Sequence, residues 1–156
     1  MRSFKLVLVI CVFMLFGAES GLACTCAPPQ SASQELERVT AVFSGKVVEI
    51  KRHKQPSHLF GSVEVIFKVK KVWKGVDEKT ISIFTSSQSA ACGYGFKAGR
   101  TYLVYAHGND EGRLTTNICS RTRRLKNARE DLEELGAGKG VARESRLKRG
   151  SSHFKA

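Results

Sequence analysis

The stretch Val63-Glu64-Val65-Ile66-Phe67-Lys68-Val69 carries apolar side chains at every second position, and charged residues stand at two of the three positions between them. A period of two indicates a β-strand that is buried on one face and exposed on the other. The pattern runs on toward Trp73 and stops at Lys74-Gly75, where a turn is expected. This segment therefore predicts a long, half-buried strand in a sheet.

Further strands are expected on both sides of this one. Residues 41–50 are rich in valine and isoleucine, and Gly45 within them is typical of a β-bulge. Three more apolar or aromatic segments are bounded by turn residues, at 79–85, 101–106 and 114–119. Five short antiparallel strands with one or two flanking helices predict an all-β fold. We expect a five-stranded Greek-key barrel, which is the OB-fold.

Two helices are expected beside the strands. Ser31 and Gln34 have the spacing of a capping box, which predicts a short helix over residues 32–39. A second helix is indicated by apolar residues at helical spacing, and Gly136 fits its end: Leu125, Ala128, Leu132 and Leu135. Its charges oppose the helix dipole, because arginines precede it and Glu133-Glu134 lie near its end. We expect its carboxylates, at 130–134, to form a solvated face.

Residues 1–23 have the layout of a secretory signal peptide. A basic start is followed by an apolar run over residues 6–16, and Gly21-Leu22-Ala23 precede Cys24. The apolar run is shorter than the roughly 20 residues that span a bilayer. We therefore expect a secreted, extracellular protein that starts at Cys24. A retained membrane anchor and a lipoprotein modified at Cys24 are the alternatives.

The mature chain is expected to be one domain over residues 24–136, followed by a basic disordered tail over residues 137–156. That tail holds six lysines and arginines against one glutamate, and the whole chain has a net charge of +12. Such a charge favours adhesion to anionic surfaces, or it serves only solubility. A monomer is expected.

Four cysteines remain in the mature chain, at 24, 26, 92 and 119. In an exported protein an even number of cysteines predicts two disulfides rather than free thiols or a redox-active pair. A bridge between Cys24 and Cys26 would close a strained ring, so both are expected to bond into the body of the domain. The other two pairings remain open on these grounds.

The sequence shows no pattern typical of an enzyme. No two of His53, His58, His107 and His153 have the spacing of metal ligands, and nucleophile or phosphate-binding motifs are absent from the sequence. We expect no catalytic residues and no cofactor of its own. Arginines at 121, 123 and 124 with nearby aromatic residues would suit nucleic acid. Export argues against that partner, so none is expected.

The mature N-terminus offers one reactive group of interest. A neutral α-amine and the carbonyl oxygen of Cys24 would form a five-membered chelate on a metal ion. A disulfide at Cys24 would hold this chelate rigid, and Pro28-Pro29 would stiffen the chain after it. Catalytic zinc keeps an open coordination position, so such an arm could plug the zinc site of another protein.

Five motifs resemble one known family. Cys24-Thr25-Cys26-Ala27-Pro28-Pro29 is similar to the opening of the tissue inhibitors of metalloproteinases, which have a netrin-like (NTR) domain. Four later motifs are also similar: Phe43-Ser44-Gly45, Lys71-Val72-Trp73-Lys74-Gly75, Ala91-Cys92-Gly93-Tyr94 and Thr116-Asn117-Ile118-Cys119-Ser120. The resemblance covers about residues 24–120 and implies an OB-fold with bridges Cys24–Cys92 and Cys26–Cys119.

The resemblance also implies a function and a set of contact residues. The main-chain amine and carbonyl of Cys24 would chelate the catalytic zinc of a target metalloproteinase. Thr25 would enter the pocket just past the cleavage point, and Cys26, Ala27 and Pro28 would lie along the substrate groove. Ala90 and Ala91 would fill the other side.

The sequence also departs from this family. Leu36 stands where a cysteine of a third bridge is expected, a second cysteine-rich domain is not expected, and the loop over residues 51–60 is short. Because netrin-like domains also serve as binding modules, a second function is weighed: a non-inhibitory module attached to anionic cell-surface or matrix polymers through residues 137–156.

Overall fold

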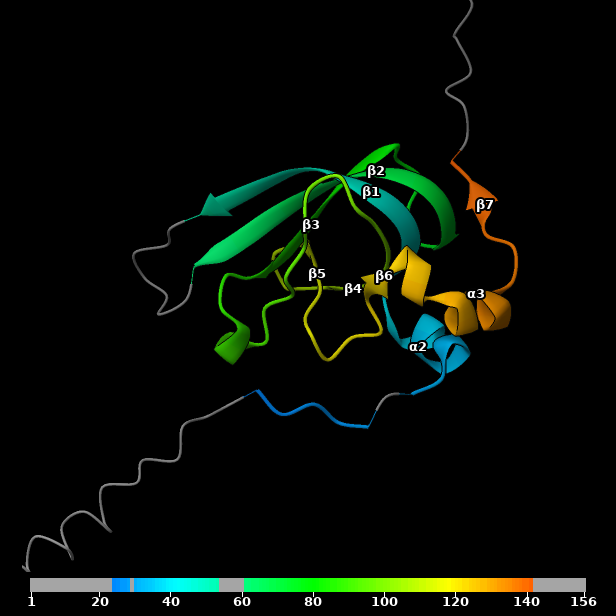
Figure 1. The fold of residues 1–156 in the computed structure, drawn as a ribbon, viewed down its shortest axis with the longest axis horizontal. Helices are drawn as coiled ribbons and strands as arrows, with labels where there is room; N and C mark the ends of the chain where they lie inside the picture. Colours follow the sequence, from blue (N-terminus) through cyan, green and yellow to red (C-terminus); the bar gives the residue numbers. More distant parts are fainter. Residues whose placement is uncertain (1–23, 29, 54–60, 142–156) are drawn as a thin grey trace, which may run out of the picture.

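The computed structural model describes residues 24–28, 30–53 and 61–141. The predicted signal peptide at 1–23 and most of the predicted tail, 142–156, lie outside these residues. Within these described ranges the elements are two helices, seven strands and two 3₁₀ turns, and Figure 1 shows how they are arranged. They are α2 (Ala32–Arg38), β1 (Ala41–His53), β2 (Ser62–Lys74), β3 (Thr80–Ser86), η1 (Ser89–Ala91), β4 (Thr101–Gly108), β5 (Leu114–Thr115), β6 (Arg123–Arg124), η2 (Leu125–Asn127), α3 (Arg129–Leu135) and β7 (Lys139–Gly140).

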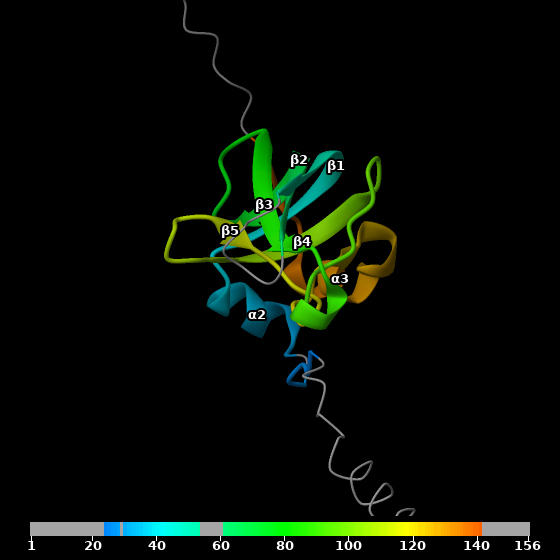
Figure 2. The ribbon, with the colours of Figure 1, turned by 90° about the vertical axis from the view of Figure 1, so that its left-hand side faces the viewer.

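Five of the strands close on themselves. Their order is β1-β2-β3-β5-β4, and β4 pairs again with β1 over residues 101–106. Neighbours are antiparallel except β3 and β5, which meet in parallel at Phe84 and Thr115. In Figure 2 the strands curve around one another, and α2 lies beneath β4 and β5. The predicted all-β fold of OB type is confirmed.

The alternating stretch of β2 forms the centre of the core. Val63, Val65, Phe67 and Val69 are buried, and the lysines at 68 and 70 are exposed. The Phe67 ring makes edge-on contacts with Phe43 and Phe96, at centroid distances of 5.5 and 5.3 Å. Edge-to-face packing of this kind adds about 0.5–1.5 kcal/mol per pair to the area that each ring buries.

The bulge predicted at Gly45 is also present. The pairing of β1 with β2 shifts register between Ser44 and Gly45. A Cβ atom at Gly45 would lie 3.1 Å from the carbonyl oxygen of Lys68, so the close approach of the two strands favours glycine.

The helices pack on a second apolar cluster, outside β1 and β4. Its buried members are Ala32, Val39, Val42, Leu103, Tyr105 and Ala128. Leu36 of α2 and Leu132 of α3 pack against this cluster, and Figure 1 shows the two helices side by side. At Leu36, where the resemblance suggested a missing cysteine, the side chain therefore packs in an apolar cluster.

Several predicted boundaries are wrong. β1 continues to His53, because residues 51–53 pair with 62–64 of β2. The last strand was expected over 114–119, but β5 ends at Thr115. Side-chain hydrogen bonds replace the ladder there: Thr116 donates its hydroxyl to the carbonyl of Tyr105, and Asn117 accepts from the amide of Cys119. Asn side chains favour such local turns over strands.

The C-terminal helix is shorter than expected, and the ordered fold runs past it. Residues 125–127 form the 3₁₀ turn η2, and the α-helix begins at Arg129. Gly136 ends it at φ 68°, as predicted. Lys139–Gly140 then pairs with β2 as β7, inside the segment that was expected to be disordered. The Trp73 indole holds this segment, since it donates to the Gly136 carbonyl at 3.0 Å.

No helix among the described residues is long and apolar enough to cross a membrane.

Candidate functional site

Two disulfides tie the N-terminal arm, residues 24–28, to the body of the fold. They join Cys24 to Cys92 and Cys26 to Cys119, with Cα–Cα distances of 5.4 and 5.1 Å. The bridges lie next to each other, because the sulfurs of Cys24 and Cys119 are 3.8 Å apart. Both pairings implied by the family resemblance are confirmed.

The first bridge ends in a tight turn after β3. Cys92 follows η1 with φ 59°, in the left-handed region, and its amide donates to the Ser89 carbonyl at 3.0 Å. A Cβ atom at Gly93 would lie 2.2 Å from the carbonyl oxygen of Ser86. Only glycine fits this position, and the Cys-Gly pair therefore sets where the sulfur of Cys92 lies.

The second bridge ends in the loop after β5. The Asn117 side chain accepts from the amides of Cys119 and Ser120, at 2.9 and 3.0 Å. The amide of Ile118 donates to the Cys92 carbonyl at 3.0 Å, which joins the two loops directly. Ile118 is 42% exposed and, with Val48, is one of two large apolar side chains that are exposed among the described residues.

The arm and the two loops form one exposed ridge, which we call the bridge ridge: residues 24–28, 89–92 and 117–120. The arm residues Thr25, Ala27 and Pro28 are exposed, Ala90 is exposed, and Ala91 is half-buried. Of the residues singled out from the sequence, the structure bonds Cys24 to the loop that carries Ala90 and Ala91, and it bonds Cys26 to the neighbouring loop at Cys119. Ile118 was missed as a contact candidate, although the motif at 116–120 already placed it beside Cys119.

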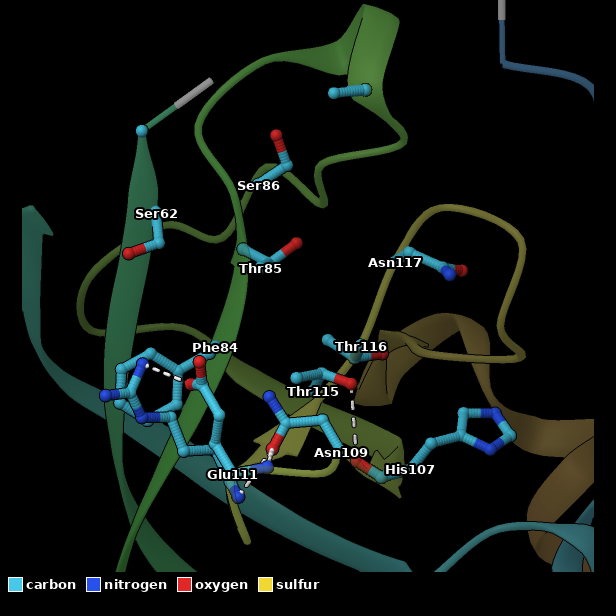
Figure 3. Close-up of a pocket in the computed structure, with 13 residues that line it drawn as sticks. Ser62, Phe84, Thr85, Ser86, His107, Asn109, Glu111, Thr115, Thr116 and Asn117 are labelled. Atoms are coloured by element: carbon cyan, nitrogen blue, oxygen red, sulfur yellow. Dashed lines mark hydrogen bonds and ion pairs between the residues drawn. The ribbon is translucent and has the colours of Figure 1, made fainter. Parts of the chain in front are cut away.

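A hollow of about 530 Å³ flanks the bridge ridge at Ala91 and Asn117. Figure 3 shows its lining, which is largely polar. Two of its hydroxyl groups are already bonded within the fold, because Thr115 donates to the His107 carbonyl and Thr85 accepts from the Tyr94 amide. Arg113 lies over the Phe84 ring at 5.1 Å from its centroid and pairs with Glu111 at 2.9 Å. The hollow thus adjoins the two loops that carry Cys92 and Cys119.

Among the described residues, the side chains that come close enough together to hold a metal ion are the cysteines at 24, 26 and 119. Thiolates bind metals, whereas these sulfurs are bonded in bridges. His53 lies 3.2 Å from Glu64, and His107 lies 3.6 Å from Glu35. His58 and His153 lie outside the described residues.

Several of the arginines and aromatic residues weighed for nucleic acid are engaged within the fold, namely Arg121, Arg123, Tyr102 and Tyr105. Tyr102 and Tyr105 are buried. The guanidinium of Arg121 binds the Asp131 carboxylate through Nε and Nη2, at 3.0 and 2.7 Å, and Arg123 approaches the same carboxylate at 3.5 Å. Burial, together with the charge of Asp131, raises the pKa of Tyr105 well above its ordinary value, so its hydroxyl stays a donor to Asp131.

The prediction that residues 130–134 form a solvated face is wrong for Asp131, which is fully buried. Its position could have been found from the sequence, because residue 131 falls on the same helical stripe as Ala128, Leu132 and Leu135. A buried carboxylate on an apolar stripe requires cationic partners, and the arginines that precede the helix supply them.

Comparison with known proteins agrees with the geometry of the bridge ridge. The family model for the tissue inhibitor of metalloproteinase matches residues 22–130. Comparison with individual curated proteins gives no match. The matched range contains the arm, both disulfides and all five strands of the closed sheet. The chain belongs to the tissue inhibitor of metalloproteinase family.

Proposed function

We propose that this protein is a secreted inhibitor of zinc metalloproteinases and that the amine and carbonyl of Cys24 chelate the target's catalytic zinc. The observation that carries the proposal is the pair of adjacent bridges, which fix Cys24 and Cys26 on an exposed ridge. Membership of the inhibitor family supports the class of partner, and extracellular disulfides agree with secretion.

The chelate needs only main-chain atoms, so the side chain of Cys24 is left to its bridge. Catalytic zinc sites hold three protein ligands and leave a further position for water or substrate. The amine nitrogen and carbonyl oxygen of one residue would replace that water and close a five-membered ring on the metal. In this proposal the zinc belongs to the protease.

The remaining contacts follow from where the arm lies. Thr25 would enter the pocket next to the zinc, and Cys26, Ala27 and Pro28 would run along the substrate groove. Ala90 and Ala91, held beside Cys24 by its bridge to Cys92, would fill the other side. The small side chains at 90 and 91 would allow the backbone of this chain to approach the backbone of the protease closely. Ile118 adds apolar area to the same face.

A rigid arm favours tight binding. Association costs about 0.5–1.5 kcal/mol for each flexible side chain that becomes fixed, and ordering of the backbone adds to this. Two bridges within three residues remove most of this cost before binding. The chelating amine exists only if the chain is cut directly before Cys24, so correct processing is a condition of the proposal.

The test is inhibition of several zinc metalloproteinases by mature protein that starts at Cys24. The same protein acetylated at its α-amine is the comparison, and mass spectrometry confirms both bridges in each sample. We expect inhibition by the free amine and a loss of at least 100-fold on acetylation. Equal inhibition by both forms would refute chelation, and no inhibition by correctly bridged protein would refute the inhibitor function for those proteases.

One observation favours the second candidate function, attachment to an anionic polymer. Lys46 of β1 and Lys68 of β2 are exposed and lie directly opposite each other, and Lys70 is exposed on the same strand. Among the described residues, no carboxylate forms an ion pair with these three lysines. Opposed like charges destabilise a sheet, and a bound polyanion would relieve that repulsion.

Retention on a heparin column separates the two candidates. The full mature chain, a chain ending at Val141, and a Lys46→Ser/Lys68→Ser variant are compared across a salt gradient. A polymer-binding module would lose retention in the strand variant, the shortened chain or both, with steep salt dependence in the parent. Equal and weak retention of all three would refute this function.

A further inference from the structure

The root of the N-terminal arm, residues 30–33, is held by side chains from near the C-terminal end of the fold. The two bridges fix the arm at Cys24 and Cys26. Its direction beyond Cys26 depends on where the chain enters α2 at Ala32. Two charged side chains far along the sequence contact this root, Arg121 and Glu134.

Arg121 joins the root to the buried network. Its Nη1 donates to the carbonyl oxygen of Gln30, and its Nε and Nη2 bind the Asp131 carboxylate. The Arg121 side chain is 12% exposed and Asp131 is fully buried, so little water competes for the bonds between Arg121 and Asp131, whereas the bond to Gln30 lies at the surface. The Tyr105 hydroxyl donates to Asp131 at 3.0 Å and so links the root to β4.

Glu134 holds the next two residues. Its carboxylate accepts from the amides of Ala32 and Ser33, both at 2.9 Å, and from the Ser33 hydroxyl. The hydrogen bonds from Ser33 and Ala32 lower the pKa of Glu134 to about 2, so it is ionised at neutral pH. A carboxylate at the start of α2 also suits the helix dipole, and this explains an acidic residue at the wrong end of α3.

We infer that Arg121 and Glu134 are positioning residues that aim the inhibitory arm by fixing its root from the C-terminal side. This inference rests on the proposed function. The arm is a short segment anchored at its tip by two bridges and at its root by these two side chains, with Pro28 and Pro29 between. Freeing the root leaves Cys24 and Cys26 tethered. The residues after Cys26, Ala27 and Pro28, can then tilt away from the position in which they would lie along the substrate groove.

Matched variants separate aiming from stability. Arg121→Lys keeps a cation beside Asp131 but cannot reach both Asp131 and Gln30, because one ammonium lacks the forked geometry of guanidinium. Arg123→Lys is its control, since Arg123 also faces Asp131 and donates Nε to the Arg121 carbonyl without touching the root. Glu134→Gln is compared with Glu133→Gln, whose native partner is Arg129 on the same helix.

Each variant of the mature protein is assayed for inhibition well below its unfolding temperature. Amide order parameters of Thr25 to Ala27 are measured in the same samples. Loss of a hydrogen bond to a charged group corresponds to about a tenfold change, so we expect Arg121→Lys and Glu134→Gln to weaken inhibition about tenfold. Arm order parameters should fall from about 0.85 toward 0.6. Both control variants should change inhibition less than twofold and leave the arm rigid.

Two results would overturn the inference: unchanged arm order parameters in Arg121→Lys and Glu134→Gln, or equal losses of inhibition in the variants and their controls. A change in unfolding temperature alone, with inhibition and arm order intact, would make both residues structural only. If the parent inhibits none of the proteases, the proposed function fails, and the order parameters still decide whether the root is held in this way.

Discussion

Removal of the second bridge by Cys26→Ser/Cys119→Ser should destabilise the protein. The size of the loss depends on the length of the loop that this bridge closes in the unfolded chain. The bridge spans 93 residues, for which loop-closure entropy predicts about 4.7 kcal/mol. The first bridge remains in the variant, however, and shortens the path. From Cys26 back to Cys24, across to Cys92 and on to Cys119, the path in the unfolded chain is about 30 residues. The same relation then gives about 3.6 kcal/mol.

When one bridge is intact, the other closes a loop of about 30 residues, and this length is the same for both bridges. Removal of Cys24–Cys92 should therefore cost a similar amount, although its own span is 68 residues. For a domain of this size, about 3.6 kcal/mol lowers the unfolding temperature by about 10–15 °C. Calorimetry and urea denaturation measure the change, and Ala27→Ser serves as a control that adds a serine to the arm without touching a bridge.

A loss below about 1 kcal/mol would refute this reasoning, because it would mean that the bridge does not restrict the unfolded chain. The double variant should also lose inhibition, since Cys26 no longer holds the arm on the bridge ridge. Full inhibition with the expected loss of stability would show that the bridge at Cys24 suffices for the arm.

Three further predictions concern single residues. Asp131→Ala leaves the guanidinium of Arg121 unpaired in the interior, and urea denaturation should show a loss of about 3–5 kcal/mol. Glu134→Gln should be less stable than the parent above pH 4.5, and the difference should vanish as the pH falls toward 2, because the lowered pKa of Glu134 makes its contribution disappear over that range; a difference that persists at pH 2 would contradict this. Gly93→Ala must move the turn that carries Cys92, so its unfolding temperature should fall and inhibition should weaken, whereas Gly95→Ala, which has open space, should do neither.

Short sequence patterns correctly predicted those features of the fold that depend on interactions between residues close together in the chain. The alternation at 63–69 places four side chains in the core, and the Ser31 capping box is present in α2 with both of its hydrogen bonds. Gly45 and Gly136 act as predicted at a bulge and a helix end. In each case the physical cause lies within a few residues of the pattern.

Features that depend on distant partners could not be predicted in this way. The last strand ends early because Thr116 finds the Tyr105 carbonyl across the sheet. Glu134 is unfavourable near the end of its own helix. It stabilises instead the start of α2, about one hundred residues earlier in the chain, and a local pattern cannot reveal that contact. The disulfide pairing was open on spacing alone, and the family resemblance decided it before the structure confirmed it.

The central claim is that the Cys24 amine binds the zinc of a target protease, and the absorption spectrum of a cobalt-substituted metalloproteinase tests it most directly. Cobalt(II) in a zinc site has visible bands that respond to a change of ligand. Addition of mature protein with a free amine should shift these bands with the same dose dependence as inhibition, and the acetylated protein should leave them unchanged. Inhibition by the free-amine protein with an unaltered cobalt spectrum would show that it blocks the protease without touching the metal.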